Sequence, residues 1–414
     1  MRRYLAVLGA PHAKALVLAA FVARLPIAMT PLALLLLVRD STGDYAAAGA
    51  VTAVFALCEG IAAPVQGRII DRFGQTPSLV ATATLFPLAV WGVALAAEEE
   101  ASTLLVAALA ALAGLVLPPV MATMRALWPD VVRDPKLVET AYALEASLQE
   151  LFFFSGPLLV ALAVTLASPA AAVVAAGVFG LVGTLAFAAS PVSRARGPAA
   201  RPAGGRRRGG ALAGNGMRTV VGTGLLCGCA FGTIEVALPA FADAQGARGA
   251  AGLLLAAFAL GSFAGGLAYG ARVWRASLDR RYPRALAAFA AGLVPVLLAP
   301  SLPVMVVASL VAGAAIAPIF ATGYAIVGRI APAGTITEAY AWISTSIVLG
   351  VAVGNATAGA LVEASSHRGA LLAGLTVALL AALVARRRRA TLSGAARPAA
   401  PSPARAPASA GAGR

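Results

Sequence analysis

The sequence has little charge, almost no histidine and few cysteines. Only 12% of its 414 residues are charged, and it contains two histidines and three cysteines, whereas soluble domains carry about 25% charged residues. The histidines, His12 and His367, stand at the edges of apolar runs, and the cysteines, Cys58, Cys227 and Cys229, lie inside them. These positions exclude a disulfide framework, a metal-ligand cluster and a histidine-based triad inside the apolar runs. We therefore expect no metal and no cofactor, and no phosphate-binding loop of the P-loop type is found.

Apolar residues dominate what remains, and they occur in long runs. The chain is 60% hydrophobic, with a mean hydropathy of +0.86. A membrane-spanning helix needs about 20 mainly apolar residues, because the bilayer core offers no water to unpaired backbone groups. Twelve runs are long enough, namely residues 14–38, 45–66, 79–97, 101–127, 138–167, 170–190, 219–242, 249–271, 284–301, 303–327, 337–362 and 368–385. The sequence thus predicts an all-α polytopic membrane protein with 12 transmembrane helices.

The basic residues are distributed unevenly between the two sides of the predicted membrane. With the N-terminus inside, 27 of the 32 Lys and Arg residues fall on the inner side, and three, Arg39, Arg248 and Arg368, fall in outer loops. The other two, Arg24 and Arg125, lie within predicted helices. By the positive-inside rule, both termini are expected in the cytoplasm. The net charge of +15 then reflects topology and contact with the anionic lipid bilayer, and we expect no nucleic-acid partner.

A basic segment rich in Gly, Pro and Ala divides the chain into two halves. Residues 191–217, PVSRARGPAARPAGGRRRGGALAGNGM, have no apolar period, which predicts a flexible cytoplasmic linker between six spans and six. The N-terminal half is then 1–190 and the C-terminal half is 218–388. The tail, 389–414, has the composition of the linker and is expected to be disordered.

The two halves share an internal repeat. PVMAT begins at Pro119 and PIFAT at Pro318, an offset of 199 residues, and the AYA that begins at Ala141 recurs at an offset of 198. Gly156 recurs as Gly354, also at an offset of 198. Ordered matches of this kind indicate that spans four and five are duplicated as spans ten and eleven. They predict two pseudo-symmetric six-helix halves.

The loop between spans two and three carries the most specific motif. GRIIDRFGQTP, residues 67–77, resembles the signature that transporters of the major facilitator superfamily carry in this loop. The matching residues are Gly67, Asp71, Arg72 and Gly74. The positions that are usually basic are occupied by Gln75 and Thr76. Members of this superfamily are built from parallel six-helix repeats. With the twelve spans, the basic linker and the repeat, the resemblance covers about residues 10–388. It is greatest to small bacterial drug-efflux and sugar-efflux members.

Two further elements resemble this superfamily, and one departs from it. WPDVVRD resembles the element after span four, matched by Pro129, Asp130 and Arg133. SGP, with Gly156 and Pro157, resembles the Gly-Pro core of the fifth-helix motif of proton-coupled antiporters, although LLVAL follows where that motif ends in paired glycines. In the second half, GGLAYGARVW occupies the loop corresponding to the first motif, with no aspartate at the expected place.

The loop motif has a chemistry suited to joining the two halves. Gly67 lets its helix approach a neighbour closely, and Asp71 can accept hydrogen bonds from the free amides of a helix N-terminus. The resemblance implies that this helix is span eleven, beginning near Thr337. Arg72 is expected to pair with Asp130 or another loop carboxylate. We therefore expect a conformational lock that closes the inner side when the protein opens outward; the alternative is a basic loop that only sets topology.

Ionisable residues within the predicted helices are costly in the membrane, so each is a candidate for substrate binding or proton coupling. These candidates, with one polar residue, are Arg24, Glu59, Glu145, Glu150, Glu235 and Asn355. The resemblance implies that spans one and five adjoin, so Arg24 is expected to pair with Glu145 or Glu150. Glu235 has no obvious partner in its half, and burial without a partner favours a protonated carboxyl, so it is the favoured proton carrier. Arg125 is expected at the inner edge, and structural ion pairs remain the alternative.

Together these features predict a secondary active transporter of a small-molecule solute that works by alternating access. We expect the proton gradient to drive it, with protons as the second partner, and the resemblance favours efflux by antiport and a monomer in the bacterial cytoplasmic membrane. A solute importer of the same fold, by symport or uniport, and a non-transporting sensor or scaffold remain alternatives. An enzyme is not expected, because no catalytic constellation is found. Few fixed charges suit an uncharged, amphipathic or cationic solute, although Arg24 could receive an anion.

Overall fold

The computed structural model describes residues 2–132, 134–199 and 210–393, which form helices and no strand. The first half contains α1 (Arg2–Leu8), α2 (Ala13–Thr42), α3 (Tyr45–Phe73), α4 (Gln75–Glu98), α5 (Thr103–Val116), α6 (Val120–Val131), α7 (Pro135–Leu166), α8 (Pro169–Ala189) and α9 (Pro191–Ala195). The second contains η1 (Gly210–Ala213), α10 (Asn215–Ala244), η2 (Arg248–Ala250), α11 (Ala251–Ala271), α12 (Leu278–Leu298), α13 (Leu302–Gly313), α14 (Ile316–Ile330), α15 (Ile336–Ala364), α16 (His367–Arg387) and η3 (Arg389–Thr391). The all-α fold class is as predicted.

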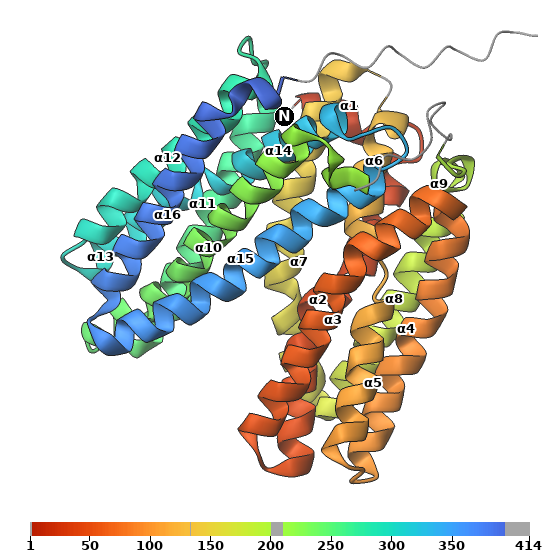
Figure 1. The fold of residues 1–414 in the computed structure, drawn as a ribbon. Helices are drawn as coiled ribbons and strands as arrows, with labels where there is room; N and C mark the ends of the chain where they lie inside the picture. The colour runs from red at the N-terminus through yellow and green to blue at the C-terminus, as the bar shows by residue number, and fades with distance from the viewer. Residues whose placement is uncertain (1, 133, 200–209, 394–414) are drawn as a thin grey trace, which may run out of the picture.

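The helices form two bundles that meet at one end of the molecule and diverge toward the other (Figure 1). α2, α3, α4, α5 and α8 make up one bundle, and α10, α11, α12, α13 and α16 make up the other. α7 and α15 run along the boundary, and each packs against both bundles: α7 contacts α2 and α11, and α15 contacts α10 and α3. These equivalent crossings are what a duplicated six-helix half predicts.

Eleven spans in the described chain are long and apolar enough to cross a membrane. The remaining predicted span, 284–301, corresponds to α12, whose first turns carry Asp279, Arg280 and Arg281. The helix therefore begins before its apolar part, because backbone hydrogen bonds continue through polar residues as well as apolar ones. The same effect starts α10 at Asn215, inside the predicted linker.

Spans four and ten are each broken into two helices. α5 gives way to α6 at Pro118 and Pro119, and α13 gives way to α14 just before Ile316. A proline lacks the amide that a continuous helix needs, so the break in span four follows from the sequence. The break in span four lies at the start of PVMAT, and the break in span ten lies just before PIFAT, which begins at Pro318 inside α14. The two halves are thus broken near equivalent positions of the repeat.

Part of the predicted linker is helical, since α9 and η1 lie within it. Residues 200–209 of the linker, and residues 394–414 of the tail, lie outside the described residues. The flexibility and disorder predicted there remain predictions.

The buried apolar residues form two clusters, and large apolar side chains also cover the outside. One cluster, which includes Phe55 and Phe86, lies within the first half. The other joins residues of both halves, such as Trp128 and Tyr340. Many leucines remain exposed, for example Leu104 at 81%, which fits a surface that faces lipid rather than water.

Candidate functional site

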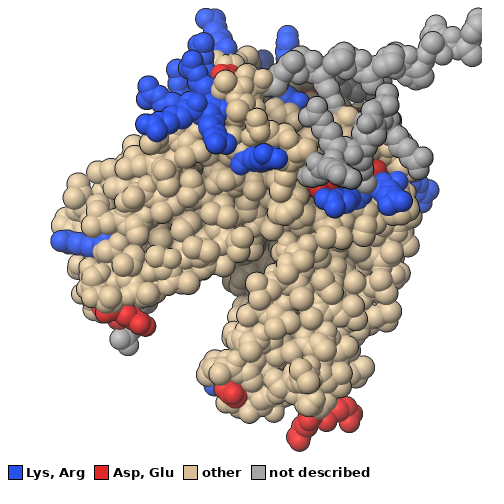
Figure 2. All heavy atoms as spheres, viewed as in Figure 1, with Lys and Arg blue, Asp and Glu red and all other residues tan. Residues whose placement is uncertain are grey.

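The site lies between the two halves, where a notch separates the bundles. Figure 2 shows this notch opening at the end where the bundles diverge, whereas most of the visible Lys and Arg side chains gather at the end where the bundles meet. We call the latter the basic end. The positive-inside rule predicts it to be cytoplasmic. The structure is therefore closed at the basic end and open at the other.

At the basic end, Asp71 on α3 holds the first turn of α15. Its two carboxylate oxygens accept hydrogen bonds from the backbone amides of Thr337, at 3.1 Å, and Glu338, at 3.0 Å. α15 has no side-chain cap of its own, so Asp71 supplies the anion that a helix N-terminus favours. The contact occurs at the helix and residue that the resemblance implied.

Two neighbours of Asp71 strengthen this crossing. A Cβ at Gly67 would lie only 2.8 Å from the Cα of Glu338, so the two backbones touch where this glycine stands. Arg68 donates to the Glu338 carboxylate at 2.7 Å, and the amide of Ala211 donates to the same group at 3.3 Å. Neither Arg68 nor Glu338 was among the predicted site residues.

The predicted partner of Arg72 is wrong. Asp130 pairs with Arg196 at 2.6 Å, because the chain after α9 returns to the end of α6 and brings Arg196 there. Arg72 is exposed and lies over the ring of Phe73. Gly74 ends α3 with a φ of +97°, which few other residues adopt. The predicted Arg133 lies outside the described residues.

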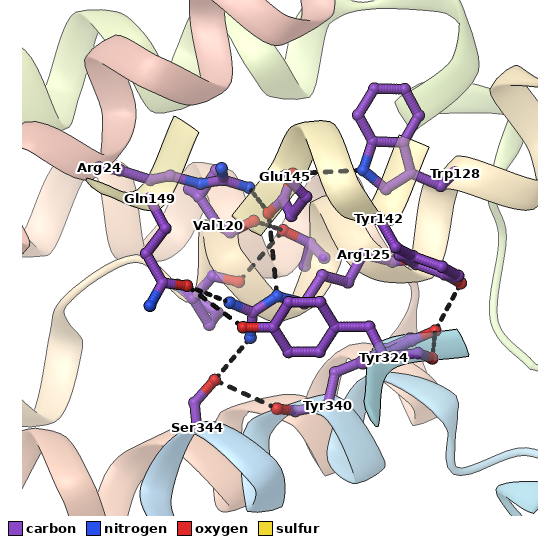
Figure 3. Close-up of polar contacts among 12 residues, drawn as sticks. Arg24, Val120, Arg125, Trp128, Tyr142, Glu145, Gln149, Tyr324, Tyr340 and Ser344 are labelled. Atoms are coloured by element: carbon purple, nitrogen blue, oxygen red, sulfur yellow. Dashed lines mark hydrogen bonds and ion pairs between the residues drawn. The ribbon is translucent and has the colours of Figure 1, made fainter. Parts of the chain in front are cut away.

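Deeper in the molecule, Arg24 and Glu145 form a buried ion pair (Figure 3). Their atoms approach to 2.6 Å, and the side chains are 2% and 1% exposed. Trp128 donates to the other Glu145 oxygen at 3.2 Å. Of the two carboxylates predicted for Arg24, the structure selects Glu145, on the adjoining helix α7.

Arg125 is buried, which corrects its predicted place at the inner edge. It is 1% exposed, and its guanidinium lies 3.8 Å from Glu145. Ser344 and Gln149 accept hydrogen bonds from it at 2.7 and 3.0 Å. The break before α6 places Arg125 in the second turn of a new helix, turned toward the centre.

The repeat positions meet one another at this centre. Tyr142 and Tyr340, equivalent at an offset of 198, share a hydrogen bond of 2.6 Å between their hydroxyls. Arg125 corresponds to Tyr324 at an offset of 199, and its guanidinium lies 3.9 Å from the centre of that ring. Equivalent residues can touch only near the axis that relates the two halves, so this cluster marks the axis. The repeat was the signal that could have found Tyr324.

Two other predicted carboxylates have neutral partners. Glu150 on α7 accepts a hydrogen bond of 2.8 Å from Ser262 on α11, so it links the two halves. Glu235 is bonded by Asn355 at 3.4 Å, which corrects the expectation that it has no partner in its half. Glu59 lines a small cavity of about 60 Å³, and no hydrogen bond or ion pair involving it occurs within the described chain.

Gly156 lies where α7 crosses α2, and a Cβ there would come within 2.9 Å of the Ala28 carbonyl carbon. Its repeat Gly354 meets Cys229 of α10 in the same way. Pro157 follows within α7. The two glycines are therefore contact points of equivalent helix pairs.

Replacing Gly156 with alanine should destabilise the protein by about 1–3 kcal/mol, because the added methyl group overpacks this crossing. Thermal unfolding in detergent would measure the loss. Gly359→Ala is the matched control, since nothing lies within 4 Å of a Cβ at that glycine. Equal effects of the two substitutions would contradict a packing role for Gly156.

Comparisons with known proteins agree with this architecture. The sequence profile of the Major Facilitator Superfamily matches residues 16–246 and again residues 220–411. A comparison with curated proteins yields no match.

Solved structures of transporters share the fold. A bacterial homologue of the iron transporter ferroportin, in an outward-facing state, superposes with a TM-score of 0.72 over 90% of this chain and 98% of its own, at 15% identity. The fucose:proton symporter of E. coli gives 0.72 over 91% and 98%, at 13% identity. The human organic anion transporter MFSD10 gives 0.65 over 93% and 99%, at 16% identity.

A multi-pass protein of two duplicated six-helix halves, which meet at one end and diverge at the other, belongs to the class of secondary transporters of solutes. The family match covers nearly the whole chain. The chain belongs to the Major Facilitator Superfamily, whose members are transporters rather than enzymes.

Proposed function

We propose that this protein is a monomeric transporter of the bacterial cytoplasmic membrane that exports a small organic solute in exchange for protons. Alternating access would expose the notch between the halves first to one side and then to the other. The closed basic end and the open opposite end are what the outward-open stage of such a cycle requires. Export is favoured by the Gly-Pro element of α7, whose resemblance is to antiporters.

The hydrogen bond between Glu150 and Ser262 is the observation that carries the coupling proposal. An intramembrane carboxylate without a cationic partner is a functional candidate by default. This one touches the opposite half, so a change in its charge changes a contact between α7 and α11. Glu235 is bonded by Asn355 within its own half, so it can bind a proton but is not linked directly to the other half.

Proton coupling is tested with purified protein in liposomes that contain a pH-sensitive dye and carry an imposed pH gradient. A panel of antibiotics, dyes, sugars and organic acids is added, and dissipation of the gradient is recorded. We expect one class of compound to move protons, and Glu150→Gln to lower the coupled flux at least about tenfold, because glutamine keeps the shape but cannot release a proton. Glu235→Gln is measured beside it.

Glu99→Gln is the matched control, because Glu99 is exposed at the end of α4. If Glu235→Gln alone abolishes proton movement, Glu235 is the carrier and Glu150 is not. If a compound crosses the membrane without protons in the wild type, the coupling proposal is wrong while transport stands. Movement of a solute only together with protons in the same direction would establish import.

A second candidate concerns the charge of the solute. Arg24 is neutralised by Glu145, whereas Arg125 reaches that carboxylate only at 3.8 Å. These three side chains therefore keep one net positive charge near the axis, which favours an anionic solute. One structural neighbour is an organic anion transporter, but at 16% identity this likeness concerns the fold alone. Proton movement with the organic acids of the panel would indicate an anionic solute, whereas movement with the other compounds would indicate a cationic or neutral one.

A further inference from the structure

The second half lacks the aspartate that joins the halves in the first. With the repeat offset of 199, Gly67 corresponds to Gly266 and Asp71 corresponds to Gly270. α11 packs on α7 as α3 packs on α15, so the same crossing occurs twice. At the second crossing, the position that corresponds to the aspartate is a glycine and carries no side chain.

The helix that would receive this aspartate is also different. α7 begins with its own cap, because Asp134 accepts a hydrogen bond of 2.9 Å from the amide of Lys136. α15 has no such cap and depends on Asp71. The second crossing therefore needs another chemistry to hold it closed.

Tyr4 of the N-terminal helix α1 occupies the place of the missing aspartate. Its side chain is 6% exposed, and its hydroxyl donates to the carbonyls of Gly266, at 2.9 Å, and Leu267, at 3.1 Å. A Cβ at Gly270 would lie within 2.9 Å of the Tyr4 Cζ, so the absence of a side chain at Gly270 makes room for the tyrosine. Burial raises the pKa of Tyr4 to about 12, so the hydroxyl keeps its proton.

Arg3 completes the link between α1, α7 and α11. Its Nε donates to the Thr140 hydroxyl at 3.0 Å, and Thr140 donates to the Gly270 carbonyl at 3.1 Å. The other guanidinium nitrogens reach the carbonyls of Lys136 on α7 and Arg272 after α11. One side chain thus contacts both halves.

We propose that α1 is a second latch at the basic end, in which Arg3 and Tyr4 replace the aspartate that the second half lacks. The two latches use opposite chemistry: Asp71 accepts from backbone amides, whereas Arg3 and Tyr4 donate to backbone carbonyls. Glu139 adds an ionic link at this end through Arg281 at 2.7 Å and Arg329 at 3.2 Å. The proposal needs only that the halves move relative to each other, and it is independent of the solute and of protons.

Spin labels on the full-length protein test the second latch. With Cys58, Cys227 and Cys229 replaced by alanine, labelled cysteines at Phe73 and Arg280, both exposed, report the separation of α3 and α12 across the basic end. The Tyr4 hydroxyl has a single proton, which its two carbonyl acceptors share, so its loss removes about 1 kcal/mol of net stabilisation. We expect Tyr4→Phe to increase the fraction of molecules open at the basic end about fivefold, and Arg3→Gln/Tyr4→Phe to increase it further.

Tyr282→Phe is the matched control, because its buried hydroxyl bonds Thr223 at 2.9 Å within the second half. Thermal unfolding in detergent is measured for every variant, so that a general loss of stability is separated from a shift between states. A larger increase in the open fraction for Tyr4→Phe than for Tyr282→Phe supports the latch. Unchanged label distances in both α1 variants would show that α1 is only an anchor, and would overturn the proposal.

Discussion

Glu145→Gln is expected to destabilise the protein by about 3–5 kcal/mol, the cost of removing one partner of a buried ion pair. Glu145 neutralises Arg24 at 2.6 Å and lies 3.8 Å from Arg125. Glutamine leaves both guanidinium groups without a counter-charge inside the membrane, where a lone charge is costly. The unfolding midpoint of the purified variant in detergent should fall accordingly.

A double variant separates charge from packing. Arg24→Met/Glu145→Met removes the pair together, and buried pairs replaced by apolar residues often lose little stability. We expect it to recover part of the stability lost in Glu145→Gln, because Arg24 no longer needs a counter-charge while Arg125 still lacks the carboxylate at 3.8 Å. If Glu145→Gln unfolds at the wild-type temperature, or the double variant is less stable than Glu145→Gln, the ion pair does not stabilise this fold.

Asp71→Ala is expected to have the largest effect on the balance between conformations. It removes two hydrogen bonds to a charged acceptor, each worth about 1.5–3 kcal/mol. They join α3 to α15 across the closed basic end, so separating the halves at this end would break them. The population open at this end should rise on the order of 100-fold. Spin labels at Phe73 and Arg280 measure this shift, and solute transport should fall because the outward-open stage is rarely reached.

Asp130→Ala is the control for this experiment. Asp130 lies at the same end, but its partner Arg196 lies in the linker directly after α9 rather than in the second half, and the carboxylate is 54% exposed. Such exposed pairs contribute little, so its label distances should match the wild type. Equal shifts for Asp71→Ala and Asp130→Ala would mean that the loop acts only through its charge.

The sequence predicted the residues of the first latch because their chemistry is local. A glycine before a close crossing and an aspartate four residues later are readable as a short motif, whereas the helix beginning near Thr337 was implied by the resemblance. The partner of Asp130 was not readable, since Arg196 reaches it only where the chain after α9 returns to α6. Within the motif, Arg68 rather than Arg72 pairs with a carboxylate, that of Glu338.

The buried centre shows the same division. That Arg24 needs a carboxylate follows from the cost of a lone charge in the membrane, and two acidic residues on one helix were the natural choices. Only the rotation of α7 against α2 and α11 decided that Glu145 faces Arg24 and Glu150 faces Ser262. Arg125 was misplaced because the break before α6 changes the direction of the side chain, which composition does not reveal.

By itself, the sequence determined that this chain spans a membrane, that its halves are duplicated, and that one loop carries an aspartate able to cap a helix N-terminus. These properties depend on hydropathy, repeat spacing and local hydrogen-bonding chemistry, all of which are encoded over short stretches. The tertiary structure alone decided that Tyr142 meets Tyr340, that Arg125 lies over Tyr324, and that Tyr4 fills the gap left at Gly270. Those contacts join residues more than 190 positions apart, and they exist only because the two halves pack around a shared axis.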